Sequence, residues 1–207
     1  MRKKIILSLM LMMALPNFLT AQKNDSTTSI SRILMLQATI CPGRMFYHGD
    51  MWNSYFNSTL EWCFDNRVSI RANGFYFFST QGNYRPFKMN HSLMLGAFYH
   101  YPKRKFDYYF GVEPGAALIQ QYSYTFNDST IVNPPIKVSP LITASTGINY
   151  FFWKYMNIFA AIKFVHGTYI PPYGNSIPLD ELRISAGIGW HVQFKRKGSN
   201  IWVGGFE

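Results

Sequence analysis

Hydrophobic and polar residues alternate with a period of two over most of this chain, in stretches of about ten residues separated by polar breaks. In a β-strand such alternation places every second side chain on one face. A first, less regular stretch covers residues 32–41, and the clear rows follow at 54–64, 68–78, 91–101, 106–122, 142–152, 156–164 and 182–194. The pattern therefore predicts an all-β chain of eight strands.

The two faces of these strands differ in chemistry. In the last row Leu182, Ile184 and Trp190 share one face, whereas Arg183 and Ser185 lie on the other. An apolar face opposite a small or polar one, over about ten residues, is typical of a tilted transmembrane strand with lipid outside and a filled lumen inside. A secreted β-sandwich or a lipocalin-like fold is the alternative.

The breaks between the rows alternate between short and long. Short turns are predicted at 65–66, 102–105 and 153–155, and long loops at 42–53, 80–90, 123–138 and 167–178. Aromatic residues gather near the short-turn ends, as in an interfacial girdle: Trp62, Phe64, Tyr99, Tyr101, Tyr108, Tyr150, Phe152 and Phe194. This arrangement predicts an antiparallel transmembrane barrel with short periplasmic turns, long extracellular loops and both termini in the periplasm.

The N-terminus has the layout of a secretory signal peptide, with a basic start, an apolar run from Ile5 to Leu15 and small residues before Gln22. We expect a signal peptide at 1–21, a periplasmic lead-in at 22–30, a barrel at 31–195 and a basic, aromatic tail at 196–207. Charged residues make up only 14% of the chain and aromatic residues 18%. Soluble domains carry about 25% charged residues, so this composition also favours a membrane protein.

The chain is basic, with a formal net charge of +10 that falls to +7 when the three basic residues of the predicted signal peptide are removed. The remaining bases cluster at 103–105 and 195–197. We expect these clusters to contact anionic lipid headgroups, with solubilised turns as the alternative reading. An exported protein does not meet nucleic acid, and we expect no nucleic-acid partner.

With these features the chain resembles the small outer-membrane barrels of the OmpA/OmpX type, from about Ser31 to Lys195. The resemblance rests on architecture, and it departs at the C-terminus, where Phe206 is penultimate and not last. It implies a location in the bacterial outer membrane, contact with its lipids and lipopolysaccharide, and a structural or surface-interaction role through the extracellular loops. An extracellular ligand or an envelope-complex partner would fit this role.

Several charged residues fall on the predicted lumen face, where charges are shielded from water and must pair. We expect lumen ion pairs among Glu61, Arg71, Glu113, Lys163 and Arg183. Glu61 and Arg71 sit at similar height on neighbouring strands, and Glu113 and Lys163 lie near mid-height. Because eight strands leave an interior that side chains fill, the lumen is predicted to be closed by these pairs. A narrow gated pore is the alternative.

A second group of candidate residues lies at the outer end of the last two strands. His166, Thr168 and Asp180 are predicted to share the lipid-facing side, and together they supply the base, nucleophile and orienting acid of an acyl-transfer site. The stretch resembles the motif of PagL-type lipid A deacylases, with Thr in place of Ser, Asp in place of Glu, and Tyr169 after the nucleophile. This resemblance implies, as the alternative to a non-enzymatic barrel, a lipid A acyl-ester hydrolase.

The remaining features suggest little further chemistry. Cys41 and Cys63 are predicted at opposite ends of neighbouring strands and are expected to be free thiols. No spacing of His, Cys and Asp suggests a metal site, and we expect no metal and no cofactor. Aromatic residues crowd the predicted long loops, where they would bind a partner or glycan or pack on one another: Tyr122, Tyr124, Phe126, Tyr169 and Tyr173.

Overall fold

The structure is a computed structural model that describes residues 29–47, 51–82, 85–126, 130–132, 134–172 and 175–194. The predicted signal peptide, the predicted tail and the basic cluster at 195–197 lie outside these residues. Within them no helix is long and apolar enough to cross a membrane. The strands are β1 (Ile33–Met45), β2 (Met51–Cys63), β3 (Val68–Gln81), β4 (Phe87–Lys103), β5 (Phe106–Gln121), β6 (Tyr124–Phe126), β7 (Thr130–Val132), β8 (Lys137–Trp153), β9 (Met156–Tyr169), β10 (Ile177–Pro178) and β11 (Glu181–Gln193).

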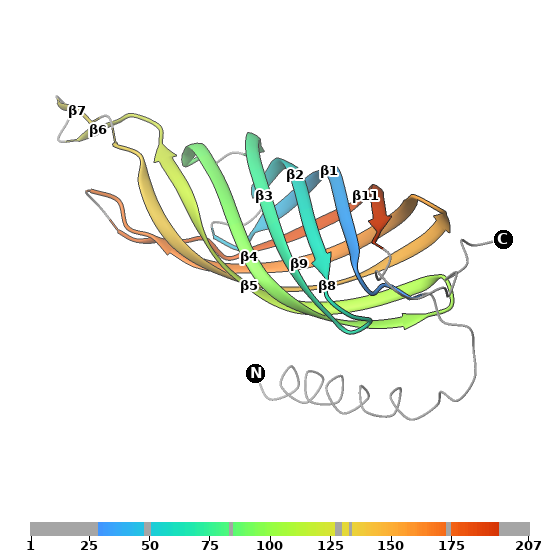
Figure 1. The fold of residues 1–207 in the computed structure, drawn as a ribbon. Helices are drawn as coiled ribbons and strands as arrows, with labels where there is room; N and C mark the ends of the chain where they lie inside the picture. The colour runs from blue at the N-terminus through green and yellow to red at the C-terminus, as the bar shows by residue number, and fades with distance from the viewer. Residues whose placement is uncertain are drawn as a thin grey trace, which may run out of the picture.

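Eight long antiparallel strands of the described chain close into a barrel. Their order is β1-β2-β3-β4-β5-β8-β9-β11, and pairing of β11 with β1 returns the sheet to its start. The strands run obliquely around a common axis, with the β6–β7 hairpin projecting from one end (Figure 1). The predicted fold class, an eight-stranded antiparallel barrel, is confirmed.

The alternation predicted from the sequence sets which side of the barrel each residue faces. On β5, Phe110 is 59% exposed, whereas its neighbours in the inward register, Tyr109 and Glu113, are 2% and 0% exposed. In the described residues, 34 large hydrophobic side chains are exposed, and the largest buried side chains include Arg71, Arg183 and Lys163. The barrel thus has an apolar exterior and a largely polar interior, which reverses the usual arrangement of a soluble domain.

The two ends of the barrel differ, as the alternating breaks predict. At the short-turn end, β4 and β5 are joined by two residues, of which Arg104 has a positive φ of 53°. The Asp65 carboxylate shapes another short turn, because it accepts hydrogen bonds from the backbone nitrogens of Arg67 and Val68 at 2.6 and 2.8 Å. The described chain begins and ends here too, where Phe194 N donates to Arg32 O at 3.0 Å.

The strands extend farther toward the opposite, long-loop end than predicted. The connection between β1 and β2 covers only 46–50, and that between β3 and β4 only 82–86, so the predicted loops at 42–53 and 80–90 were too long. The polar residues that suggested loops are inward-facing strand residues. Asn53 Nδ2 donates to Glu181 Oε1 at 2.8 Å, and Thr80 Oγ1 donates to Asn53 Oδ1 at 2.8 Å.

Close packing between strands requires glycine at Gly96 on β4. A Cβ atom there would lie 2.2 Å from the Val112 carbonyl oxygen and 2.7 Å from Glu113 Cα, and both are backbone atoms that cannot move aside. Pro114 follows on β5, and its missing N–H interrupts the pairing with β4. The register of β4 against β5 is the same on both sides of this interruption, so the bulge that a strand proline suggests is not formed.

Candidate functional site

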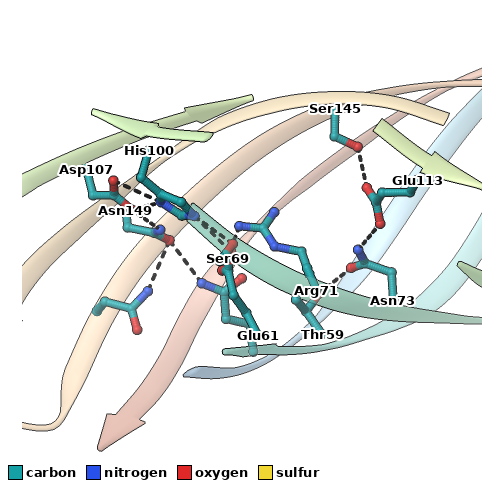
Figure 2. Close-up of polar contacts among 12 residues, drawn as sticks. Thr59, Glu61, Ser69, Arg71, Asn73, His100, Asp107, Glu113, Ser145 and Asn149 are labelled. Atoms are coloured by element: carbon teal, nitrogen blue, oxygen red, sulfur yellow. Dashed lines mark hydrogen bonds and ion pairs between the residues drawn. The ribbon is translucent and has the colours of Figure 1, made fainter. Parts of the chain in front are cut away.

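The interior near the short-turn end is organised around Glu61 of β2 (Figure 2). Arg71 Nη2 lies 2.7 Å from Glu61 Oε2, and Ser69 Oγ donates to Glu61 Oε1 at 2.5 Å. The Arg71 guanidinium also lies 4.0 Å from the ring centroids of both Phe98 and Tyr109. The pair is fully buried, and ring contacts on two sides hold the cation in place.

A histidine that was not among the predicted site residues extends this network. His100 of β4 places Nε2 3.1 Å from Glu61 Oε1 and Nδ1 2.9 Å from Asp107 Oδ2. Asn149 Nδ2 donates to Asp107 Oδ2 at 3.0 Å, and this chain of contacts crosses the lumen (Figure 2). The alternation along β4 indicates its position, because His100 lies between the outward-facing Tyr99 and Tyr101 and therefore faces the lumen.

A second buried pair lies farther along the axis, between Glu113 of β5 and Lys163 of β9. Their Nζ–Oε1 distance is 3.7 Å, longer than a hydrogen bond. The Glu113 carboxylate is held more closely by Ser145 Oγ, which donates to Oε1 at 2.5 Å, and by Asn73 Nδ2, which donates to Oε2. Lys163 is therefore a nearby compensating charge, and neutral donors position the carboxylate.

A third pair occupies the half of the lumen nearer the long loops. Arg183 Nε donates to Glu181 Oε2 at 2.7 Å, and both residues belong to β11. Asn53 and Tyr55 also donate to the Glu181 carboxylate. Arg183 was predicted from the sequence without its partner, although Glu181 is two residues away and shares the inward register.

Side chains fill the lumen between these pairs. An internal void near mid-height is lined by residues such as Gln37, Arg71, Tyr109 and Lys163, and it is too small to hold a water molecule. Apolar clusters fill both ends, one around Ile30 and Phe151 and a larger one toward the long loops. In the described residues, side chains therefore occupy the interior around this void and at both ends of the barrel.

The predicted rim residues come together on the outer surface. His166 and Thr168 of β9 are exposed, and Asp180, directly before β11, is partly exposed. His166 Nδ1 lies 2.6 Å from Asp180 Oδ1. Because a carboxylate only accepts hydrogen bonds, Nδ1 carries the hydrogen, which leaves Nε2 as an acceptor in the neutral ring. In this part of the described chain the Thr168 hydroxyl makes no hydrogen bond.

Other residues frame this rim site. Arg44 of β1 pairs with Leu182, two residues after Asp180, and on the other side Lys137 Nζ donates to Ile170 O at 3.0 Å. Phe46 and Phe164 lie on the same outer surface, with ring centroids 6.1 Å apart. The site therefore combines cationic side chains, an aromatic surface and a His–Asp pair at the boundary between the apolar exterior and the long loops.

The aromatic residues of the predicted loops have different placements. Tyr122 is 51% exposed, whereas Tyr169 is fully buried and packs edge-on against Phe87, with ring centroids 6.0 Å apart. The loop assignment of Tyr169 was wrong, because β9 continues to this residue and its register points inward. Tyr173 lies outside the described residues, and so do the side chains of Tyr124 and Phe126.

Both cysteines are free, as predicted, and both are buried. Cys41 accepts a hydrogen bond from Ser185 Oγ at 3.3 Å. Cys63 lies at the other end of the barrel, and its thiol is within 4.8 Å of ligand atoms of Glu61 and His100.

Solved structures share this fold. The N-terminal β-barrel domain of Pseudomonas aeruginosa OprF matches with a TM-score of 0.51 and 11% identity over 80% of this chain and all of that chain. The outer membrane protein OprG of P. aeruginosa matches with a TM-score of 0.58 and 9% identity, over 79% of this chain and 97% of its own.

Neisserial surface protein A (NspA) gives a TM-score of 0.53 and 12% identity, over 78% of this chain and 96% of its own. No family model and no curated protein sequence matches the chain. At these identities the likeness concerns the fold, which is that of a small eight-stranded barrel of the OmpA/OmpX type.

Proposed function

We propose that this protein is a non-conducting barrel of the bacterial outer membrane that acts at the cell surface through its long-loop end. The observation that carries the proposal is the reversal of polarity across the barrel wall. Ile40 and Leu93 are 67% and 66% exposed, whereas Glu61 and Arg183 are 0% and 1% exposed. A continuous exposed apolar belt is unfavourable in water and is stable in a bilayer.

The dimensions and the edges of the belt support the same conclusion. The eight long strands hold 13 to 17 residues each, and a strand tilted by about 45° needs only about 9–11 residues to cross the hydrocarbon core. At the short-turn end outward aromatic rings lie close together, as Trp62 and Phe194 do with centroids 5.4 Å apart. Such rings favour the lipid–water boundary.

The closed interior indicates where function is to be sought. The internal void beside Arg71 and Lys163 has no room for water, which supports a barrel that does not transport solutes through its lumen. The long-loop end carries the β6–β7 hairpin, which projects beyond the barrel (Figure 1). The proteins that share the fold include one named as a surface protein and one named as an attachment invasion locus protein. These observations support a surface-interaction role.

Two experiments test this proposal. The full chain, produced in bacterial cells, should be recovered in the outer-membrane fraction and should give no steady channels in planar bilayers. Steady large channels would refute the closed plug. A variant with residues 123–136 replaced by a two-residue turn should fold normally and lose surface adhesion. Unchanged adhesion would place the interaction elsewhere.

A second candidate function is acyl-ester hydrolysis of outer-leaflet lipid, as the PagL-type resemblance implies. One specific observation favours it, namely the 2.6 Å contact between His166 Nδ1 and Asp180 Oδ1 on the lipid-facing side. Histidine oriented by a carboxylate is the base of a nucleophilic triad, and Thr168 follows two residues later on the same face.

The chemistry can be written with these residues alone. Thr168 Oγ1 would attack the ester carbonyl carbon while His166 Nε2 accepts its proton, and the alcohol would leave with that proton as the ester C–O bond breaks. Water would then hydrolyse the acyl-threonine and release the fatty acid. Arg44 and Lys137 flank the site, where cations would hold lipid phosphates.

Mass spectrometry of lipid A from cells with and without the protein tests this function. The expected result is the loss of one acyl chain with the wild type and no loss with Thr168→Ala. Thr146→Ala, which removes an outward threonine hydroxyl in the middle of β8, is the matched control and should keep the activity. An identical acylation pattern in all strains would exclude the hydrolase.

A further inference from the structure

A buried group of potential metal ligands lies inside the barrel near the short-turn end. Glu61 and Cys63 belong to β2 and His100 to β4, and their ligand atoms all lie within 4.8 Å of one another. All three side chains are fully buried. We propose that this cluster is a binding site for one zinc-class divalent ion.

The donor set suits that class of ion. Thiolate, imidazole and carboxylate are the three ligand types that Zn²⁺ uses in proteins, with bonds of about 2.0–2.3 Å. Ion binding would draw the three donor atoms together across β3, the strand between β2 and β4. Ser69 of β3 already contacts two ligands, since its Oγ lies 2.5 Å from Glu61 Oε1 and 2.8 Å from His100 Nε2.

The residues around the ligands have the arrangement of an outer shell. His100 Nδ1 lies 2.9 Å from Asp107 Oδ2, which leaves Nε2 directed toward Glu61. A carboxylate on the far nitrogen of a ligating histidine fixes the ring orientation and increases its basicity. Asn149 in turn donates to Asp107 at 3.0 Å, so the carboxylate is itself held in place (Figure 2).

Charge balance permits the ion despite the nearby Arg71. Both ring nitrogens of His100 face carboxylates, so both carry hydrogens and the ring is an imidazolium when no metal is bound. Binding requires a thiolate and a neutral imidazole, so one proton leaves Cys63 and one leaves His100. Loss of these two protons lowers the summed charge of Glu61, Cys63, Arg71, His100 and Asp107 by two, and the divalent ion restores it.

The Cys63 thiol has no competing role in the described structure. No hydrogen bond of its sulfur is present among the described residues, in contrast to Cys41, which accepts one from Ser185. Ile30, Ile33 and Phe151 cover Cys63 from the short-turn end. An ion would therefore enter while the barrel forms, before these side chains close over it.

Cobalt is the probe for the test, because thiolate-bound Co²⁺ has a characteristic charge-transfer absorption. The untagged full chain is folded into detergent with Co²⁺ and freed of excess metal. We expect one ion per chain together with the thiolate absorption. Cys63→Ser should abolish this absorption, whereas Cys41→Ser, the matched control at the other buried cysteine, should retain it. Asp107→Asn should weaken binding about 10- to 100-fold.

The proposal is overturned if the folded wild type holds no cobalt, if Cys63→Ser keeps the absorption, or if Cys41→Ser loses it. X-ray absorption of wild type folded with Zn²⁺ gives a second measurement that needs no variant. One sulfur at about 2.3 Å and nitrogen or oxygen ligands at about 2.0–2.2 Å are expected. A shell without sulfur would refute the site, while leaving the proposed location and surface role unaffected.

Discussion

Replacing Arg183 with Met tests whether the buried ion pairs keep the barrel folded. Arg183 is 1% exposed, its Nε donates to Glu181 Oε2 at 2.7 Å and its Nη1 donates to Ser92 Oγ at 3.0 Å. The guanidinium also lies 4.2 Å from the ring centroid of Tyr55. Methionine is unbranched and apolar, so Arg183→Met removes the charge and keeps most of the volume.

The expected cost comes from the carboxylate that remains. Asn53 and Tyr55 still donate to Glu181, but its negative charge is no longer balanced by a cation in contact with it. Removing one partner of a buried pair costs about 3–5 kcal/mol in free energy of unfolding. Glu181→Gln combined with Arg183→Met removes both charges and should recover at least about 1 kcal/mol of the loss.

The rim pair supplies a control of nearly equal length. His166 and Asp180 are 2.6 Å apart, but their side chains are 62% and 33% exposed. Exposed pairs contribute about 0–1 kcal/mol, so Asp180→Asn should change stability by no more than that amount. The two substitutions therefore separate the effect of burial from the effect of distance.

Urea unfolding in detergent micelles, followed by tryptophan fluorescence, measures the stability of all three variants. Trp52 and Trp190 are 39% and 53% exposed on the outer surface, so their emission reports the loss of the apolar surroundings. Coincident unfolding and refolding curves are needed before free energies are compared. If Arg183→Met lies within about 1 kcal/mol of the wild type, or costs no more than Asp180→Asn, the reasoning from burial is wrong.

Two further substitutions follow from the packing and the turns. Gly96→Ala should cost about 1–3 kcal/mol in free energy of unfolding in the same urea assay, because its Cβ meets fixed backbone atoms. Gly74→Ala is the control and should cost less, because its Cβ meets only Ser58 Oγ at 3.1 Å. Equal effects of the two substitutions would contradict this reasoning. Two backbone hydrogen bonds hold the pKa of Asp65 below its usual value. The Asp65 carboxylate therefore stabilises the fold fully at pH values above its unfolded-state pKa of about 3.9, and this stabilisation is lost as the pH falls through the folded-state pKa. Asp65→Ala should therefore lower the urea midpoint at pH 7 and have little effect near pH 2, and a pH-independent difference would refute this role.

The fold could be predicted because the alternation of residues is a local property. Residues such as Phe110 and Glu113 reveal their side of the wall by their place in a period of two, without knowledge of the neighbouring strand. The loop boundaries were predicted less well, because a polar residue that faces a polar lumen resembles a loop residue. Asn53, Thr80 and Asn90 are inward strand residues of this kind.

The candidate sites depend on contacts between distant strands, and a sequence pattern contains only part of that information. The shared face of His166 and Asp180 followed from register, but their hydrogen bond depends on how the chain returns between β9 and β11. The approach of Cys63 to His100 depends on the register of β2, β3 and β4 together. No spacing along the chain indicates it, which is why no metal ligand was predicted.

The polar plug has a consequence for how the barrel is assembled. Its contacts join residues far apart in the chain: Gln37 bonds Asn149, and Asn53 bonds Glu181. A sheet that has not yet closed lacks these contacts between distant strands, and lipid cannot replace them. Partly closed intermediates are therefore costly inside a bilayer, so we expect insertion and closure to be one cooperative event, slowed by the long loops that must be brought together first.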